Sequence, residues 1–228
     1  MGTPPRYGDL KVGIFGGTFN PIHLGHLRSA EEVREAFALD RIYFVPAARP
    51  PHKSGEALAS APHRLKMVEL AVADHPAFSV SAVEVERTGP SYSVDTIRHF
   101  LADLHPVSLF FIIGLDAFHE IHTWKDYQVI PSLCNLIITS RPGVSTPPLE
   151  QLLPVALRSV LWYDPAVRMY RHASSNHLIL HEIQGLNISA SQIRSTVRQG
   201  KSIRYLVRSA VATYITAHAL YQREEVLR

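Results

Sequence analysis

The sequence predicts an α/β fold built on a doubly wound parallel sheet, with a small helical lobe at the C-terminus. Short apolar runs that end at glycine or turn residues alternate along the chain with segments of helical apolar spacing. One run, residues 107–113, is almost wholly apolar, which is typical of a central parallel strand covered on both faces. The chain has 228 residues, 46% hydrophobic and 19% charged, enough to form the core of one such domain.

The opening unit is a strand, a glycine loop and a helix. Residues 11–15 form an apolar run that stops at Gly16 and Gly17, where the backbone can bend freely. From residue 24 to about residue 39 the apolar positions recur every three or four residues, which indicates an amphipathic helix. Residues 41–45 predict a second strand, and the prolines of the following loop keep that loop extended and clear of the sheet.

Helices and strands continue to alternate through the middle of the chain. The predicted elements are a helix over residues 62–74, a strand over 78–85, a helix from Ser93 through Leu104, and strands over 107–113 and 133–139. Strands that alternate with helices in this way predict a Rossmann-like sheet with helices on both faces.

In the C-terminal third of the sequence, the residue patterns predict one more strand and three helices. Residues 144–176 are rich in proline and serine, and within them residues 148–160 have the pattern of one helix. The remaining predicted elements are a strand over 178–183, a helix over 190–199, and a helix over 205–221 with Val207, Val211, Tyr214 and His218 along one face. We therefore divide the chain into an N-terminal extension, residues 1–10, a core, residues 11–185, and a C-terminal helical part, residues 186–228, which belongs to the same folding unit.

Composition restricts the classes of partner. The net charge is only +3 and the basic residues are scattered, so nucleic acid is not an expected partner. No apolar run is long enough to cross a bilayer, and no membrane partner is expected. The single cysteine, Cys134, lies in an apolar stretch and indicates a buried thiol in a reducing compartment, so we expect a cytoplasmic protein. The sequence is compatible with a homo-oligomer.

The glycine loop and the residues after it have the features of a phosphate site. A loop between the first strand and its helix lies at the carboxyl ends of the strands, where α/β sheets bind ligands. Gly16 and Gly17 let backbone N–H groups approach phosphate oxygens, and the helix directs its positive end at the same anion. His23 and His26 stand three apart at the helix start, so both imidazoles face one side and can donate to a phosphate.

This segment, TFNPIHLGH, resembles the HxGH signature of the nucleotidyltransferase superfamily. The resemblance implies that His23 and His26 contact the phosphates of ATP and stabilise charge while the α-phosphorus is attacked. It also assigns Gly16, Gly17, Thr18 and Phe19 to ATP binding. The alternative interpretation is a pair of surface histidines beside an ordinary turn between a strand and a helix.

A second signature lies near the C-terminus, in ISASQIR. Ser189 has the position of a helix N-cap, and Gln192 three residues later completes a capping box. Capping gives no reason for Arg194, but helical side chains lean toward the N-terminus, so Arg194 can reach an anion over the first turn. The segment resembles the ISSTxxR motif of the same superfamily, with Ser191 in place of threonine. That motif binds the ATP triphosphate, which implies roles for Ile188, Ser189, Ser191 and Arg194.

Three further segments narrow the family, although each has an ordinary structural explanation as a turn, a capped helix or a packed aromatic ring. They are the sequence GPSYS that ends at Ser93, the pair Gly114 and Asp116 with the downstream Trp124, and the turn that begins at Arg141. Read together, they resemble the bacterial nicotinate-nucleotide adenylyltransferases over nearly the whole chain.

The resemblance assigns a role to each residue of the mononucleotide site. Trp124 would stack on the nicotinate ring. Asp116, beside Gly114, would accept hydrogen bonds from ribose hydroxyls, and Arg141 would pair with the mononucleotide phosphate. The list is completed by Tyr92 and Ser93 near the pyridine carboxylate, and by Lys53, which is either a phosphate contact or solvated surface.

The reaction that the resemblance implies joins nicotinate mononucleotide to the AMP part of ATP. A phosphate oxygen of the mononucleotide attacks the α-phosphorus in line, pyrophosphate leaves, and nicotinate adenine dinucleotide is formed. Mg²⁺ is expected as a cofactor carried by the triphosphate, with no metal site built by the protein. The alternatives are a related transferase with a nicotinamide mononucleotide or phosphopantetheine acceptor, and a nucleotide-binding module without catalytic activity.

Overall fold

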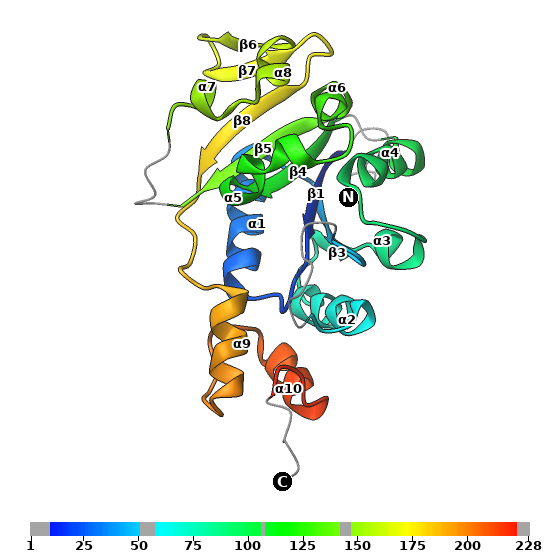
Figure 1. The fold of residues 1–228 in the computed structure, drawn as a ribbon, viewed down its shortest axis with the longest axis vertical. Coiled ribbons are helices and arrows are strands. Elements are labelled where there is room, and N and C mark those ends of the chain that lie inside the picture. Colours follow the sequence, from blue (N-terminus) through cyan, green and yellow to red (C-terminus); the bar gives the residue numbers. More distant parts are fainter. Residues whose placement is uncertain (1–9, 51–57, 106–107, 142–146, 223–228) are drawn as a thin grey trace, which may run out of the picture.

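The fold is an eight-stranded sheet flanked by helices, seen in a computed structural model that describes residues 10–50, 58–105, 108–141 and 147–222 (Figure 1). The strands are β1 (Lys11–Gly17), β2 (Arg41–Pro46), β3 (Phe78–Val80), β4 (Ser108–Gly114), β5 (Asn135–Ser140), β6 (Leu161–Asp164), β7 (Met169–His172) and β8 (His177–Glu182). Across the sheet they follow the order β3-β2-β1-β4-β5-β8-β7-β6. The predicted α/β doubly wound fold is confirmed.

The parallel part of the sheet determines where a ligand can bind. All pairings from β3 to β8 are parallel, and the chain winds outward in one direction from β1 through β2 and in the other from β4. The carboxyl ends of β1 and β4 therefore flank a crevice at the point where the strand order reverses. β1 is longer than predicted, because Gly16 and Gly17 pair with Val45 and Pro46 before the chain turns.

Helices cover the sheet in two groups, each with its own hydrophobic cluster. One cluster joins the sheet to α1 (Leu24–Phe37) and α2 (Ala61–Val72). The other joins it to α4 (Ser93–Leu104), α5 (Leu115–His119) and α6 (Ile130–Leu133), and it includes the buried thiol of Cys134, as predicted. Three further short helices lie between β3 and β5 in the chain: α3 (Val83–Glu86), η2 (Ile121–Thr123) and η3 (Tyr127–Val129).

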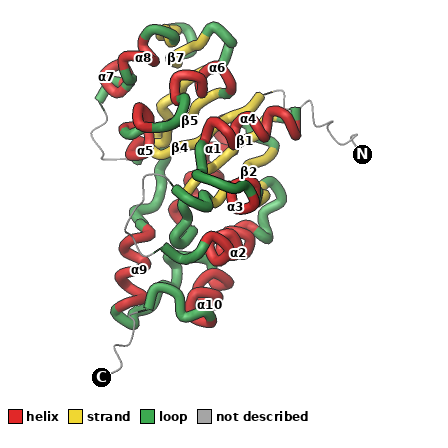
Figure 2. The backbone as a smooth tube through the Cα atoms, turned by 45° about the vertical axis from the view of Figure 1, so that its right-hand side comes forward, coloured by secondary structure: helices red, strands yellow, loops and turns green. Residues whose placement is uncertain are grey.

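The two C-terminal helices, α9 (Ala190–Arg198) and α10 (Ser209–Ala217), lie together at one end of the molecule (Figures 1 and 2). Ile193, Val211 and Ile215 are buried in the same cluster as α1 and α2, so the lobe shares a core with the sheet. α10 begins later than predicted, because Tyr205 has a left-handed backbone with φ 62°. The face predicted for this helix is correct at Val211, whereas His218 is exposed.

The other end of the sheet carries a hairpin that the sequence did not predict. β6 and β7 pair with each other and β7 pairs with β8, all antiparallel, which makes the sheet mixed. The single helix predicted over residues 148–160 is wrong. Two short helices, α7 (Leu149–Leu152) and α8 (Val155–Arg158), form instead, because Pro154 between them has no N–H to continue a helix.

The strand predicted over residues 78–85 is also wrong in its second half. β3 ends at Val80, and the alternating sequence VEVE forms the one-turn helix α3. Its turn is closed by the N–H groups of Val85 and Glu86, which donate to the carbonyl of Ala82. This turn directs the carboxyl of Glu84 into the interior, where Thr96 binds it.

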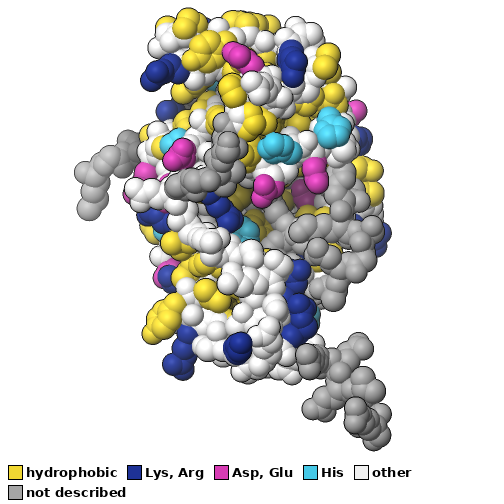
Figure 3. All heavy atoms as spheres, turned by 60° about the vertical axis from the view of Figure 1, so that its left-hand side comes forward, with side chains coloured by type: hydrophobic (Ala, Val, Ile, Leu, Met, Phe, Trp, Pro, Cys, Tyr) yellow, Lys and Arg dark blue, Asp and Glu magenta, His cyan; other side chains and the backbone are white. Residues whose placement is uncertain are grey.

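The distribution of charge on the surface agrees with the scattered basic residues expected from the sequence. On the face drawn in Figure 3, lysine and arginine side chains lie at separate places among neutral and acidic groups. In the described part of the chain, no helix combines the length and apolarity that a membrane span requires.

Candidate functional site

Two adjoining cavities open at the carboxyl ends of β1 and β4. The larger has a volume of about 500 Å³, and we call it the Trp124 cavity. The smaller, about 330 Å³, we call the His26 cavity. Gly16, Gly17 and Gly114 line both, so side-chain-free backbone forms the boundary between them. Two ligands bound side by side would meet at this boundary.

The chain turns sharply after β1. Phe19 has a left-handed backbone with φ 47°, and the bond from Asn20 to Pro21 is cis. The ring of Phe19 packs beneath Gly17, where a Cβ would lie 3.0 Å from it, and it meets His26 edge-on with ring centroids 5.2 Å apart. Glycine at position 17 is therefore needed for this close approach.

His23 and His26 lie together at the start of α1. His23 is the N-cap residue, and its ring stacks on that of His26 with centroids 3.6 Å apart and planes 25° apart. The backbone N–H of His23 donates to Nδ1 of His26 at 3.2 Å. Since that nitrogen accepts a hydrogen bond, neutral His26 carries its proton on Nε2, as a donor. The expected pairing of the two imidazoles on one side is confirmed.

His23 is an unusually buried histidine, with 3% of its surface exposed. Burial, helped by the positive charge of Arg141, lowers the pKa of His23 from 6.5 to about 4. The ring is therefore neutral near pH 7. The His23 side chain faces the backbone N–H of His26 in a capping-box arrangement, but its Nδ1 has no partner of hydrogen-bond geometry among the described residues. A buried nitrogen left in this way is a position where a ligand atom would complete the hydrogen bonding.

Gly25, between the two histidines, has a specific packing role. A Cβ at this position would lie 3.0 Å from Nδ1 and 3.1 Å from Cε1 of His23, and 3.4 Å from the carbonyl oxygen of Leu186. A side chain here would therefore force the His23 ring to shift by a few tenths of an ångström within its stack. The glycine of the HxGH sequence keeps the two rings together.

The two sequence signatures meet in space, although 174 residues separate them. Nη1 of Arg194 donates to the backbone carbonyl of Asn20 at 2.9 Å. The side-chain oxygen of Asn20 accepts from the N–H of Ala59 at 3.1 Å and from the hydroxyl of Tyr221 at 2.8 Å. Arg194 thus lies against the loop that carries the histidines, and its predicted contact with phosphate remains a prediction.

The start of α9 has the predicted cap. Oγ of Ser189 accepts from the N–H of Gln192 at 3.2 Å and lies 3.1 Å from Oγ of Ser191. Both serines are exposed, whereas Ile188 is buried against the core. These three residues line neither cavity, so their predicted contact with ATP remains a prediction.

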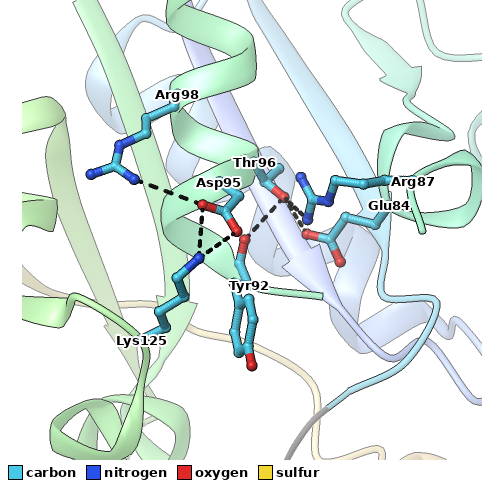
Figure 4. Close-up of polar contacts among 7 residues, drawn as sticks. All are labelled: Glu84, Arg87, Tyr92, Asp95, Thr96, Arg98 and Lys125. Carbon is cyan, nitrogen blue, oxygen red and sulfur yellow. Dashed lines mark hydrogen bonds and ion pairs between the residues drawn. The ribbon is translucent and has the colours of Figure 1, made fainter. Parts of the chain in front are cut away.

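The Trp124 cavity has an aromatic wall and a charged rim. Trp124 is partly buried and meets Phe111 edge-on, with centroids 6.3 Å apart. Tyr92 and Ser93 line the same space at the start of α4. Nζ of Lys125 lies 4.8 Å from the centre of the Tyr92 ring and is paired with Asp95 at 3.1 Å (Figure 4). An aromatic ring with a cation beside it suits a flat, anionic ligand.

A buried carboxyl, that of Glu84, forms part of the lining of the Trp124 cavity together with Thr96. Oγ1 of Thr96 donates to Glu84 at 2.5 Å, and Arg87 approaches the same hydroxyl at 3.3 Å (Figure 4). Burial raises the pKa of Glu84, while hydrogen bonds from Thr96 and Ser91 oppose this. The network fixes α3 against the first turn of α4, which carries Tyr92 and Ser93.

The structure separates the residues predicted for the mononucleotide into two groups. Gly114, Tyr92, Ser93 and Trp124 line the Trp124 cavity, together with Thr18. Asp116 and Arg141 line the His26 cavity instead, with Gly114 shared. Lys53 lies outside the described residues, as does the remainder of the turn that begins at Arg141.

Three buried polar residues in the site or directly behind it were missed in the sequence. Asn20 precedes Pro21 inside the segment that carries the HxGH signature. That position in a recognised motif was a signal that could have identified it as a site residue. Glu84 was concealed by the strand-like sequence around it. Arg64 is 1% exposed on α2, where a cation in an amphipathic helix normally indicates a solvated face. No pattern in the sequence marked Arg64 as buried.

Comparisons with known proteins agree with this geometry. Residues 14–196 match the family model described as cytidylyltransferase-like. A protein of Citrifermentans bemidjiense, named "Probable nicotinate-nucleotide adenylyltransferase", is 48% identical over 212 residues, covering 93% of this chain and 98% of that protein. A Geobacter sulfurreducens protein of the same name is 46% identical over 215 residues, covering 94% and 100%.

Solved structures add a likeness in fold. The nicotinic acid mononucleotide adenylyltransferase of Plasmodium falciparum, solved as a complex with NaAD, superposes with a TM-score of 0.69. The alignment covers 93% of this chain and 97% of that one, at 17% identity. At that identity the comparison supports the fold of the sheet and its helices.

Proposed function

The chain belongs to the nicotinate-nucleotide adenylyltransferases of the cytidylyltransferase-like family, and we propose that it joins nicotinate mononucleotide to the AMP part of ATP. The products are nicotinate adenine dinucleotide and pyrophosphate. The observation that carries the proposal is the pair of cavities that share Gly16, Gly17 and Gly114, with the HxGH histidines beside one and Trp124 in the other. ATP and nicotinate mononucleotide are thus the proposed ligands.

We assign ATP to the His26 cavity. The N-terminal end of α1 and the amides of the Gly16–Gly17 turn offer donors to phosphate oxygens. His26 would donate from Nε2, and Arg141, which lines this cavity, adds a positive charge. Asp116 lines it too, so we transfer its proposed role from the mononucleotide to the ribose hydroxyls of ATP. Arg194 approaches the same loop through Asn20 and would bind the triphosphate.

We assign the mononucleotide to the Trp124 cavity. Its pyridine ring would stack on Trp124, and its carboxylate would lie near the start of α4, at Tyr92 and Ser93. In this orientation the phosphate points to the glycine boundary and to the α-phosphorus of ATP. Arg141 lines the other cavity, and among the described residues Lys125 is the Lys or Arg side chain that lines this one.

The chemical step forms one bond and breaks another. A phosphate oxygen of nicotinate mononucleotide attacks the α-phosphorus of ATP, and the bond from that phosphorus to the bridging oxygen of pyrophosphate breaks. The attacking oxygen is already anionic near neutral pH, so no strong protein base is needed. Catalysis then depends on alignment and on neutral or cationic donors around the transferred group, which are His23, His26, Arg194 and the loop amides.

Mg²⁺ fits this arrangement as a companion of the triphosphate. Among the described residues no group of three or more His, Cys, Asp or Glu side chains could hold a metal ion, and the His26 cavity is lined by one carboxylate, Asp116. Mg²⁺ commonly binds through substrate phosphates, water and one or two carboxylates, which matches this donor set. Bound there, it would neutralise charge on the triphosphate.

The test is pyrophosphate release. The purified chain, mixed with ATP, Mg²⁺ and nicotinate mononucleotide, should release pyrophosphate and form the dinucleotide in equal amounts. No release with this mononucleotide, from protein that is folded by circular dichroism, would refute the function. A parallel reaction with nicotinamide mononucleotide measures the preference, and we expect a higher kcat/KM for nicotinate, in agreement with the named relatives.

A further inference from the structure

Arg64 is the largest fully buried side chain in the described part of the chain, with 1% of its surface exposed. It lies on α2, and no carboxylate in that part of the chain is within ion-pair distance of its guanidinium. Burying a charge without a counter-ion is costly, and proteins tolerate it only where dense hydrogen bonding compensates. Among the described residues, the compensation comes from backbone carbonyls.

Four carbonyl groups surround the guanidinium. Its Nε donates to Ala59 at 2.9 Å, and its Nη2 donates to Ala48 at 3.1 Å. Its Nη1 donates to both Thr18 at 2.8 Å and Ala47 at 2.5 Å. Arg64 therefore joins the segment directly before α2 to the loop after β1 and the loop after β2.

Two of these loops form walls of the candidate site. Thr18 and Ala47 line the Trp124 cavity, and Thr18 directly precedes Phe19, which lines the His26 cavity. Arg64 itself lines neither cavity. It lies behind the walls and donates hydrogen bonds to the backbone of both loops.

Ser91 holds the Ala48 segment from the other side. Its Oγ accepts from the N–H groups of Ala48 at 2.9 Å and Arg49 at 3.2 Å, and its own N–H donates to the carbonyl of Arg49 at 3.1 Å. Ala48 thus gives its carbonyl to Arg64 and its N–H to Ser91. Because Ser91 precedes Tyr92, one chain of contacts runs from the glycine loop to the proposed pyridine site.

We propose that Arg64 is a positioning residue for adenylyl transfer, which fixes the Thr18 loop relative to the Ala47–Ala48 loop and so aligns the acceptor phosphate with the α-phosphorus of ATP. The inference rests on the proposed function. A planar fork of five N–H donors suits this task, whereas lysine carries the same charge on one rotatable ammonium and cannot hold four separate carbonyls. A displacement of about 1 Å between reacting groups can lower a rate by about a hundredfold.

The test compares Arg64→Lys with Arg64→Met. We expect both to lower kcat by at least tenfold, measured per folded molecule, while the Kd of ATP alone changes by less than threefold, because other groups hold its phosphates. If Arg64→Lys retained normal kcat while Arg64→Met lost it, the positive charge alone would matter and the positioning role would be overturned. Normal kcat in both variants, with only a lower Tm, would overturn it as well.

Met67→Ala provides the matched control. Met67 is fully buried on the same helix and contacts the core, so its loss should lower Tm and leave kcat unchanged. A fall in kcat as large as that of the Arg64 variants would show that any damage to α2 impairs turnover, and would overturn the specific role of Arg64.

A double-mutant cycle tests the shared segment. Ser91→Ala removes the acceptor on the other side of Ala48, so Arg64→Lys combined with Ser91→Ala should lose less than the product of the two single effects. Fully multiplicative losses would contradict a common action on Ala48. Turnover by the unmodified enzyme is the separate test of function: absence of pyrophosphate release there refutes the reaction, not the placement of Arg64.

Discussion

The imidazole rings of His23 and His26 stack 3.6 Å apart, but they lie in different environments. His23 is almost fully buried and neutral, whereas His26 lines a cavity and directs Nε2 away from its backbone partner. We infer that His26 is the principal phosphate donor of the pair. His23 supports His26 through the ring stack. It contributes its own nitrogen only to a ligand that reaches the buried side of that stack.

Removal of either clamp group should reduce turnover without unfolding the protein. We expect His26→Ala and Arg194→Ala each to lower kcat by about a hundredfold or more, as for other lost groups that stabilise developing charge. Steady-state pyrophosphate release measures this. His172→Ala on β7 and Arg198→Ala on the exposed side of α9 are matched controls that should retain normal kcat. Near-normal turnover in both clamp variants would disprove the mechanism.

Gly25→Ala should act through His23. The added Cβ would lie 3.0 Å from Nδ1 of His23, so the ring must shift by a few tenths of an ångström against His26 and kcat should fall roughly tenfold. The double variant with His23→Ala gives the control, because the Cβ then has no ring to displace and should cause little further loss. An undiminished effect of Gly25→Ala in that background would exclude the steric explanation.

Trp124→Ala should weaken binding of the mononucleotide. Loss of a stacked aromatic ring removes about 1 kcal/mol beyond the buried area, so the KM for nicotinate mononucleotide should rise roughly tenfold. The KM for ATP should stay within twofold. Trp162 on β6 is 50% exposed and far from this chemistry in the sheet order, so Trp162→Ala is the matched control. An unchanged KM for the mononucleotide would contradict the stacking.

The pKa of His23 predicts a stability change with pH. The unfolded chain binds a proton on this residue below about pH 6.5, whereas the folded protein resists it down to about pH 4. Stability is therefore lost as pH falls through this window, by about 3 kcal/mol at most, since one pKa unit corresponds to about 1.4 kcal/mol. Urea unfolding at pH 7 and pH 5 should show a smaller loss in His23→Gln than in the unmodified protein. Equal losses would argue against a buried neutral ring.

Thr96→Val should destabilise the protein through Glu84. The variant keeps the shape of threonine but removes the donor to a buried carboxyl, at a cost of about 1–3 kcal/mol in the free energy of unfolding. Urea unfolding measures the loss. Thr96→Ser keeps the hydroxyl and should recover most of the stability. If Thr96→Ser were as unstable as Thr96→Val, the hydrogen bond to Glu84 would not be the cause.

The sequence predicted the parallel core and the two phosphate signatures because both are local patterns. Apolar runs followed by glycine gave β1 and β4, and three-residue spacing gave the histidine pair. The antiparallel hairpin of β6 and β7 was not predictable in the same way, because its strands have four residues each and pair at the far edge of the sheet. Their stability comes from pairing with β8 rather than from their own pattern.

The separation of Asp116 from Trp124 also required the structure. Both follow β4 closely in the chain, but the turn of α5 directs Asp116 to one cavity while Trp124 reaches the other. Arg64 shows the same limit, because the carbonyls of Thr18, Ala47 and Ala48 that it binds come from two loops distant in sequence. Periodicity along one helix carries no information about such partners.

The bare backbone at Gly114 also bears on inhibition. A Cβ there would meet no atom within 4 Å, so the space directly beside Gly114 is open to both cavities. We expect one rigid compound, with a flat ring against Trp124 and an anionic arm toward His26, to cross it and exclude both substrates at once. A substitution at Gly114 that confers resistance would also impair catalysis. A side chain that blocks such a compound enters the space where the two phosphates must meet.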